Sequence, residues 1–205
     1  MAEEFTTFDE YKVTNAGIKW FENGAYVTPS VKLGCTGKLE IETTLKTVIK
    51  KCEGDTVRSV DIPTQLKCKF TGHLPVENLR KVWGLNTKGL KKGVFAYGTD
   101  SRQGRGIMSF DVLDLDEEMT MLRAFPNMQF SGGMTWELEN GGEEIAEIEQ
   151  EFIAMKDANN KFFYEALKSE VEPDVADKWL TDFTPELVQA TSTDEGTSTD
   201  EGTVE

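Results

Sequence analysis

The stretch Ile145–Met155 reads Ile-Ala-Glu-Ile-Glu-Gln-Glu-Phe-Ile-Ala-Met, an alternation that is typical of a β-strand. Successive side chains of a strand point to opposite faces. One face holds small or apolar residues and one glutamine: Ala146, Ile148, Gln150, Phe152 and Ala154. The other face holds Glu147, Glu149 and Glu151, three carboxylates that repel one another. That face is expected to be solvated, either as an ordinary sheet surface or as a wall that repels polyanions.

The rest of the chain predicts a mainly β fold. The pair Asn23-Gly24 is a hairpin signal and joins expected strands at Gly17–Phe21 and Ala25–Val27. Pro63 separates two further expected strands, Arg58–Ile62 and Gln65–Thr71. The remaining strands are expected at Lys38–Thr43, Gly93–Tyr97, Gly106–Leu115, Met128–Ser131, Met134–Leu138 and Phe162–Leu167.

Two segments favour helices. Pro75 suits the first turn of a helix over Pro75–Trp83, and Gly84 suits its end. A second helix is expected over Asp174–Phe183, opened by Pro173. Together with the strands, these segments indicate a mainly β (α+β) fold.

The chain is expected to contain one domain, residues 1–188, and an acidic disordered tail, residues 189–205. Two copies of Thr-Ser-Thr-Asp-Glu-Gly fill Thr191–Gly202 and contain no large apolar residue. Such a segment cannot bury enough surface to offset its ordering entropy. It is either a spacer or attachment point, or a solubilising tail.

Charge and composition narrow the class of protein. The net charge of −15 argues against a protein that grips nucleic acid, although an acidic surface lets a polyanion pass without adhering. No apolar run approaches the roughly 20 residues of a membrane helix, so no membrane partner is expected. The N-terminus does not resemble a signal peptide, and three widely spaced cysteines do not indicate a disulfide framework. Synthesis and folding in a cytosol are therefore expected.

Two segments are candidates for contacts between subunits. Leu45–Asp55 has no clean period, and could be a strand or a long loop. Val48 and Ile49 in this segment are expected to be exposed and lie beside lysines in the sequence. This arrangement suits a subunit contact. The lysines are Lys46, Lys50 and Lys51. These lysines join the main concentration of basic residues in the chain, which either meets acidic patches on another copy or lies on solvated loops. Its members are Lys88, Lys91, Lys92, Arg102 and Arg105.

Motifs for catalysis and cofactor binding are missing from the sequence. His73 is the single histidine, and a Cys3His zinc site with Cys35, Cys52 and Cys68 would lack any Cys-x-x-Cys pair. There is no P-loop or dinucleotide fingerprint. We therefore expect no enzymatic activity, no metal and no cofactor. Two alternatives stay open: a carbohydrate-binding module that uses Trp20, Trp83 or Trp136, and a hydrolase built on a carboxylate pair.

The order of these features resembles the major tail proteins of long-tailed bacteriophages (siphophages), the subunits of the tail tube. The likeness covers most of Met1–Val188. It lies in Gly17-Ile18-Lys19-Trp20-Phe21 with its Asn-Gly hairpin, the helix Pro75–Trp83, the Glu-rich strand, Phe162–Leu167 and the closing Trp179 segment.

This resemblance implies a structural virion protein of the phage tail, made in the host bacterial cytoplasm. Such subunits look like a β-sandwich or barrel-like domain with one flanking helix. They form hexameric rings that stack into a hollow tube, and DNA passes down its acidic lumen during ejection without specific binding. The implied partners are other copies of the chain, the tape measure protein inside the tube, the tail terminator and the baseplate or initiator proteins. Glu147, Glu149, Glu151 and Asp111 are then candidates to line the lumen. Lys46, Val48, Ile49, Lys50 and Lys51 are candidates for a long loop that reaches the adjacent ring.

Overall fold

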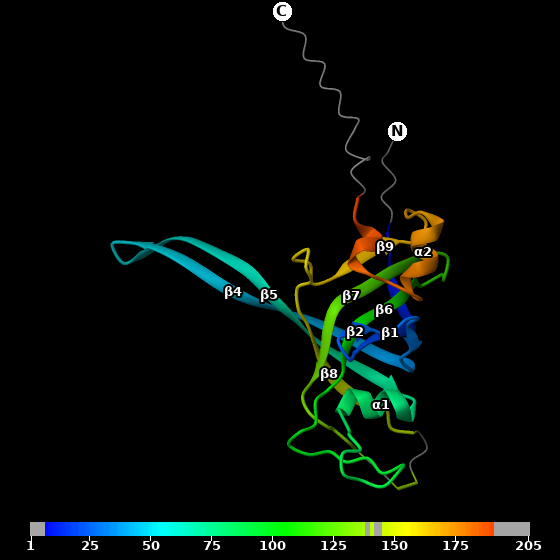
Figure 1. The fold of residues 1–205 in the computed structure, drawn as a ribbon. Helices are drawn as coiled ribbons and strands as arrows, with labels where there is room; N and C mark the ends of the chain where they lie inside the picture. The colour runs from blue at the N-terminus through cyan, green and yellow to red at the C-terminus, as the bar shows by residue number, and fades with distance from the viewer. Residues whose placement is uncertain (1–6, 138–139, 142–144, 191–205) are drawn as a thin grey trace, which may run out of the picture.

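The computed structural model describes residues 7–137, 140–141 and 145–190. Within them, nine strands form one antiparallel sheet of order β2-β1-β6-β7-β8-β5-β4, with β3 on β1 and β9 on β7 (Figure 1). The strands are β1 (Glu10–Glu22), β2 (Ala25–Tyr26), β3 (Val31–Lys32), β4 (Cys35–Cys52), β5 (Asp55–His73), β6 (Arg105–Asp114), β7 (Thr120–Ser131), β8 (Ile148–Ala154) and β9 (Tyr164–Leu167). The expected mainly β fold is confirmed.

The sheet curls toward closure. β1 and β4 stand near opposite ends of the strand order, yet they contact each other. After β3, the N–H of Leu33 donates to the carbonyl of Ala16 in β1 and leads the chain into β4. The body is therefore barrel-like, because curling of a twisted sheet brings its end strands together.

Aromatic residues fill the inside of the curled sheet. Phe125 of β7 packs edge-on against Phe152 of β8, with ring centroids 5.3 Å apart. Phe70, Phe130 and Trp20 belong to the same buried cluster. A second cluster lies around Ile107 of β6, where the C-terminal segment contributes the buried Trp179 and Phe183.

The helices follow their sequence signals. α1 (Val76–Trp83) begins after Pro75 and ends at Gly84, whose left-handed conformation lets its N–H reach the last helical carbonyls. α2 (Pro173–Trp179) begins with Pro173 as expected but ends at Trp179. A short 3-10 helix, η1 (Pro185–Val188), follows. Among the described residues, no helix has the length and apolar character needed to cross a membrane.

Several strand predictions need correction. Arg58–Ile62 and Gln65–Thr71 belong to one strand, β5, because Pro63 sits at a register shift opposite Leu45, where a residue without an N–H is tolerated. Gly93–Tyr97 lies in the loop after α1 and forms only the isolated bridge of Ala96 with Asn86.

Two further predictions concern the segment between β7 and β8. The predicted strand Met134–Leu138 is absent over Met134–Glu137, after Gly132 and Gly133 turn the chain with positive φ, and Leu138 lies outside the described residues. The predicted tail repeats, Thr191–Gly202, also lie outside them.

Candidate self-assembly surfaces

A two-stranded arm leaves the body of the protein (Figure 1). Its strands are the end of β4 and the start of β5, joined by Glu53-Gly54 with positive φ at both residues. Every residue from Leu45 to Thr64 is exposed. The predicted long loop at Leu45–Asp55 is therefore one strand of a hairpin together with its turn.

One face of the arm combines apolar and cationic side chains. Three cross-strand pairs share this face: Lys46 with Ile62, Val48 with Val60, and Lys50 with Arg58. The apolar members Val48, Val60 and Ile62 are 40–47% exposed. The carboxylate of Asp61 lies on the other face, where it accepts a hydrogen bond from the Thr47 hydroxyl at 2.6 Å.

This arm has the character of a contact surface. A two-stranded hairpin is marginally stable in water unless a third strand or another layer covers it. Contiguous exposed apolar residues on a sheet typically mark an interaction site. The sequence identified Lys46–Lys51 but missed their partners Arg58, Val60 and Ile62. The Glu53-Gly54 turn between two β-branched stretches was the available signal.

The glutamates of β8 lie on an exposed face of the sheet, as the alternation predicts. Glu149 and Glu151 are exposed, while Gln150 and Phe152 are buried. Gln150 donates to the carbonyls of Ser131 and Gly133 and so holds the turn after β7.

The prediction that Glu147 belongs to the same strand needs correction. β8 begins only at Ile148, because its partner in β5 there is Gly72, one residue before β5 ends at His73. Glu147 lies just before the strand, and its carboxylate lies beside Gly37, so close that a Cβ at Gly37 would collide with it.

Lysines from neighbouring strands make this face mixed rather than purely acidic. Lys69 of β5 stands between Glu40 of β4 and Glu151 of β8 in the sheet register. Its ammonium lies 2.8 Å from the Glu149 carboxylate, and this hydrogen bond raises the pKa of Lys69. The Lys38 ammonium likewise lowers the pKa of Glu40, chiefly through a hydrogen bond. The face can therefore present alternating charges to a passing polyanion instead of a continuous anionic wall.

Asp111 does not share this face. It lies on β6, 6% exposed, and one carboxylate oxygen accepts a hydrogen bond of 2.9 Å from Asn15. Among the described residues its other oxygen has no hydrogen-bond partner. Burial raises the pKa of Asp111. Its predicted place among solvated lumen carboxylates is therefore wrong, because β6 turns this side chain into the packed part of the body.

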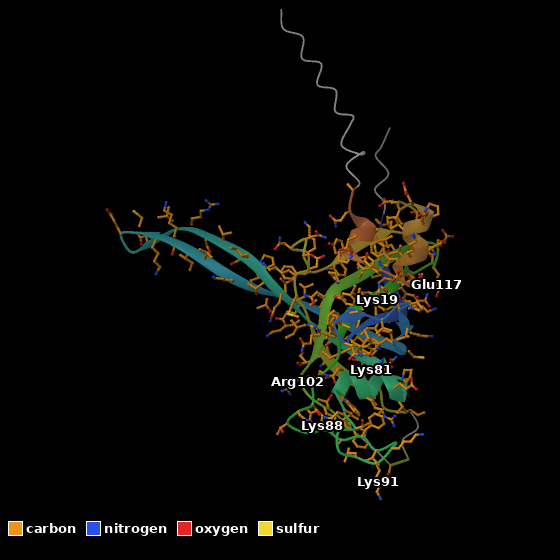
Figure 2. All side chains as sticks on the ribbon, viewed as in Figure 1. Lys19, Lys81, Lys88, Lys91, Arg102 and Glu117 are labelled. Atoms are coloured by element: carbon orange, nitrogen blue, oxygen red, sulfur yellow. The ribbon has the colours of Figure 1, made fainter. Side chains whose placement is uncertain are left out.

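The basic residues predicted as contact candidates beyond Lys46–Lys51 lie outside the arm. Lys88 and Lys91 lie on the loop between α1 and β6, at the far end of the body from the C-terminal segment (Figure 2). The Arg105 guanidinium instead stacks over the Phe21 ring at 4.0 Å. The loop therefore forms a basic surface distinct from that of the arm.

The tryptophans proposed for carbohydrate binding are mostly inside the protein. Trp20 and Trp83 are buried, and Trp136 alone of the three is exposed, at 71%. The Trp136 ring lies 6.5 Å from that of Trp83 in a tilted arrangement. The predicted groove of exposed aromatic rings is therefore contradicted for Trp20 and Trp83, because both complete the packing of the body.

The cysteines and the histidine are not gathered into one site. Cys52 lies at the tip of the arm, whereas Cys68 is buried in the core, and burial raises the pKa of Cys68 to about 12. Within the described ranges, no group of three or more His, Cys, Asp or Glu residues could hold a metal ion.

No protein-family model matches the chain, and no curated protein matches it. Among solved structures it is similar to a chain of the anti-feeding prophage cap (AFP tube terminating cap), at 8% identity and a TM-score of 0.39, over 80% of this chain and 96% of that one. It is also similar to a chain of the anti-feeding prophage baseplate, at 8% identity and a TM-score of 0.40, over 81% of this chain and 97% of that one. At these TM-scores the likeness does not by itself establish a common function.

Proposed function

We propose that this chain is a structural, non-catalytic subunit that assembles with copies of itself into a hollow tube of the phage-tail type. The observation that carries the proposal is the exposed arm Leu45–Thr64, whose apolar and cationic face has no covering layer among the described residues. A second molecule that covers this face removes the exposed valines and isoleucine from water.

In the proposed assembly, the subunits form hexameric rings that stack along the tube axis, and the arm reaches a neighbouring ring. The resemblance noted above supplies the ring number. The mixed-charge face with Glu149 and Glu151 is the proposed wall of the lumen. Alternating carboxylates and ammonium groups there lower the adhesion of DNA, since no uninterrupted cationic patch is offered to phosphates.

The same proposal specifies the partners of the chain and its location. The chain acts in the tail of a virion after synthesis in the bacterial cytoplasm. Its partners are further copies, a tape measure protein in the lumen, and the terminator and initiator proteins at the two ends. No cofactor takes part in this role.

The test is to purify the chain, concentrate it, and follow it by negative-stain electron microscopy and sedimentation velocity. Hollow tubes or stacked rings of uniform width are the supporting result. A chain that stays monomeric at its highest soluble concentration contradicts self-assembly.

A shortened variant tests the arm directly. Residues Leu45–Thr64 are replaced by Asn-Gly, a two-residue hairpin turn that then joins the paired residues Thr44 and Gln65. The thermal unfolding of the body should be unchanged, because the arm is exposed throughout. Assembly should be lost. A variant that keeps both the thermal stability of the body and normal assembly would show that the arm is not part of the contact.

A further inference from the structure

Opposite ends of the body carry opposite charges. At one end, the loop between α1 and β6 carries Lys88 and Lys91, which Figure 2 labels, and Lys92, which follows Lys91 in the sequence. At the other end, the turn between β6 and β7 carries Asp116, Glu117 and Glu118, all exposed. Glu117 is labelled in Figure 2 beside the C-terminal helical segment, far from Lys91.

Apolar side chains accompany the charges at both ends. The loop exposes Leu90, Val94 and Tyr97, between 41% and 49%. The opposite end exposes Leu115 and Tyr11, at 60% and 64%. Surfaces that combine exposed apolar side chains with charge are suited to protein contacts rather than to solvent alone.

The ion pairs of the described residues leave charge at both ends. Among the described residues, no ion pair involves Lys88, Lys91 or Lys92. On the acidic turn, Glu117 pairs with Lys12 at 3.0 Å, while Asp116 and Glu118 form no ion pair within the described chain. Each end therefore keeps charge available for a partner.

We infer that the basic loop of one copy docks on the acidic β6–β7 turn of the next copy, so that subunits join end to end. This inference rests on the proposed function. It adds the pair of surfaces that would give the tube its direction. The occupant is a second copy because this chain supplies both halves of the complementary pair. Two different surfaces on one molecule form a heterologous contact, which repeats in one direction and fits a stacked tube.

Matched charge reversals test the contact. One variant carries Lys88→Glu and Lys91→Glu, which changes the net charge from −15 to −19, because each reversal contributes two units. The other carries Asp116→Lys and Glu118→Lys, which changes it from −15 to −11. Glu117 is left in place so that its pair with Lys12 survives. Assembly is followed by sedimentation velocity and electron microscopy.

Each variant alone should raise the concentration needed for assembly at least tenfold, because both place like charges at the contact. The variant with all four reversals keeps the net charge of −15 and should assemble like the original chain, since the loop is then acidic and the turn basic. The control is Lys156→Glu with Lys161→Glu, which gives the same net charge as the loop variant but changes the segment between β8 and β9 instead of either docking surface, and should assemble normally.

The two variants change the net charge in opposite directions, to −19 and to −11, and this separates the contact from general repulsion. If net charge alone governed assembly, the turn variant would assemble more readily than the original chain. That result would overturn the inference, and so would a four-site variant that stays as defective as the loop variant. Normal assembly of all variants would overturn the end-to-end contact and leave the tube proposal standing. A monomeric original chain would contradict both.

Discussion

At the scale of single residues, Asp111 is a carboxylate that the sequence analysis predicted to be solvated and that the structure buries. Its carboxylate is buried with one hydrogen bond from Asn15, and burial raises its pKa. Leaving a buried oxygen without a partner costs about 1–3 kcal/mol. The protein tolerates this cost on β6, where Asp111 is paired in the sheet register with Leu122 of the second cluster.

Asp111→Asn should increase the free energy of unfolding at neutral pH by about 1 kcal/mol, because a neutral amide loses less hydration than a carboxylate. The folded pKa lies above the ordinary value of 3.8, so the native state binds the proton first as pH falls. The advantage of the variant is therefore complete above the folded pKa and disappears as pH falls to about the ordinary value. Urea unfolding across pH measures it. Asp116→Asn, on the exposed turn, is the control; equal pH profiles for Asp111→Asn and the original chain would contradict the prediction.

Lys19 gives a second prediction at this scale. Its ammonium is buried and bonded to the carboxylate of Asp182, which is half-exposed. Asp182→Asn should cost about 1–2 kcal/mol of unfolding free energy, since it leaves a buried cation with weaker compensation from a partner open to water. Lys19→Met should cost less, because it removes the charge as well. Thermal unfolding distinguishes them, and Glu117→Gln, in the exposed pair with Lys12, should change little. A Lys19→Met variant that is as unstable as Asp182→Asn would show that packing of the lysine chain dominates.

At the scale of elements, the arm is a ribbon whose two faces differ. The face with Val48 and Val60 has cationic neighbours, and the face with Ile49 and Ser59 includes Asp61. Only the first face combines a continuous apolar centre with cations alone. Docking through this face predicts that the two faces respond differently to the same chemical change.

Val48→Glu with Val60→Glu should abolish assembly while leaving the thermal unfolding of the body unchanged. Ile49→Glu with Ser59→Glu is the matched control, because it also places two carboxylates directly opposite each other on the ribbon. The control should retain assembly within a few-fold of the original concentration threshold. Equal loss in both variants would show that ribbon stability, rather than one docking face, controls assembly. Electron microscopy and sedimentation velocity are the measurements.

At the scale of the whole molecule, charge is distributed by surface rather than spread evenly. The chain has a net charge of −15, yet the arm face and the loop after α1 are basic and the exposed sheet face is mixed. In the proposed tube, cations concentrated on the docking surfaces leave a lumen wall that need not attract phosphates. This arrangement suits a conduit better than an evenly charged surface.

Glu149→Lys with Glu151→Lys should leave tubes intact but make them retain DNA, because the mixed face then becomes strongly cationic around Lys69. The retained DNA should be released as salt rises, since the attraction is electrostatic. Co-sedimentation of tubes with short duplex DNA measures the effect. The matched control is Glu170→Lys with Glu172→Lys, which adds the same charge on the C-terminal segment. Equal retention by the two variants would place the β8 glutamates outside the lumen.

The sequence alone determined features that depend on neighbouring residues in the chain. Alternation sorted Cys68 and Phe70 from Lys69, and Phe152 from Glu151, because period two is a property of any strand. Pro75 and Gly84 marked the ends of α1, since their backbone preferences act locally. The mainly β class followed from the sum of such signals.

Only the tertiary structure decided which of these segments meet. The arm lacks a clean period because both of its faces are exposed, so no burial imposes one, and its pairing of Val48 with Val60 is non-local. The position of Lys69 among the glutamates and the burial of Asp111 likewise depend on strand order and packing. Local preferences can specify an element and its two faces, but the environment of each face is set by segments far away in the chain.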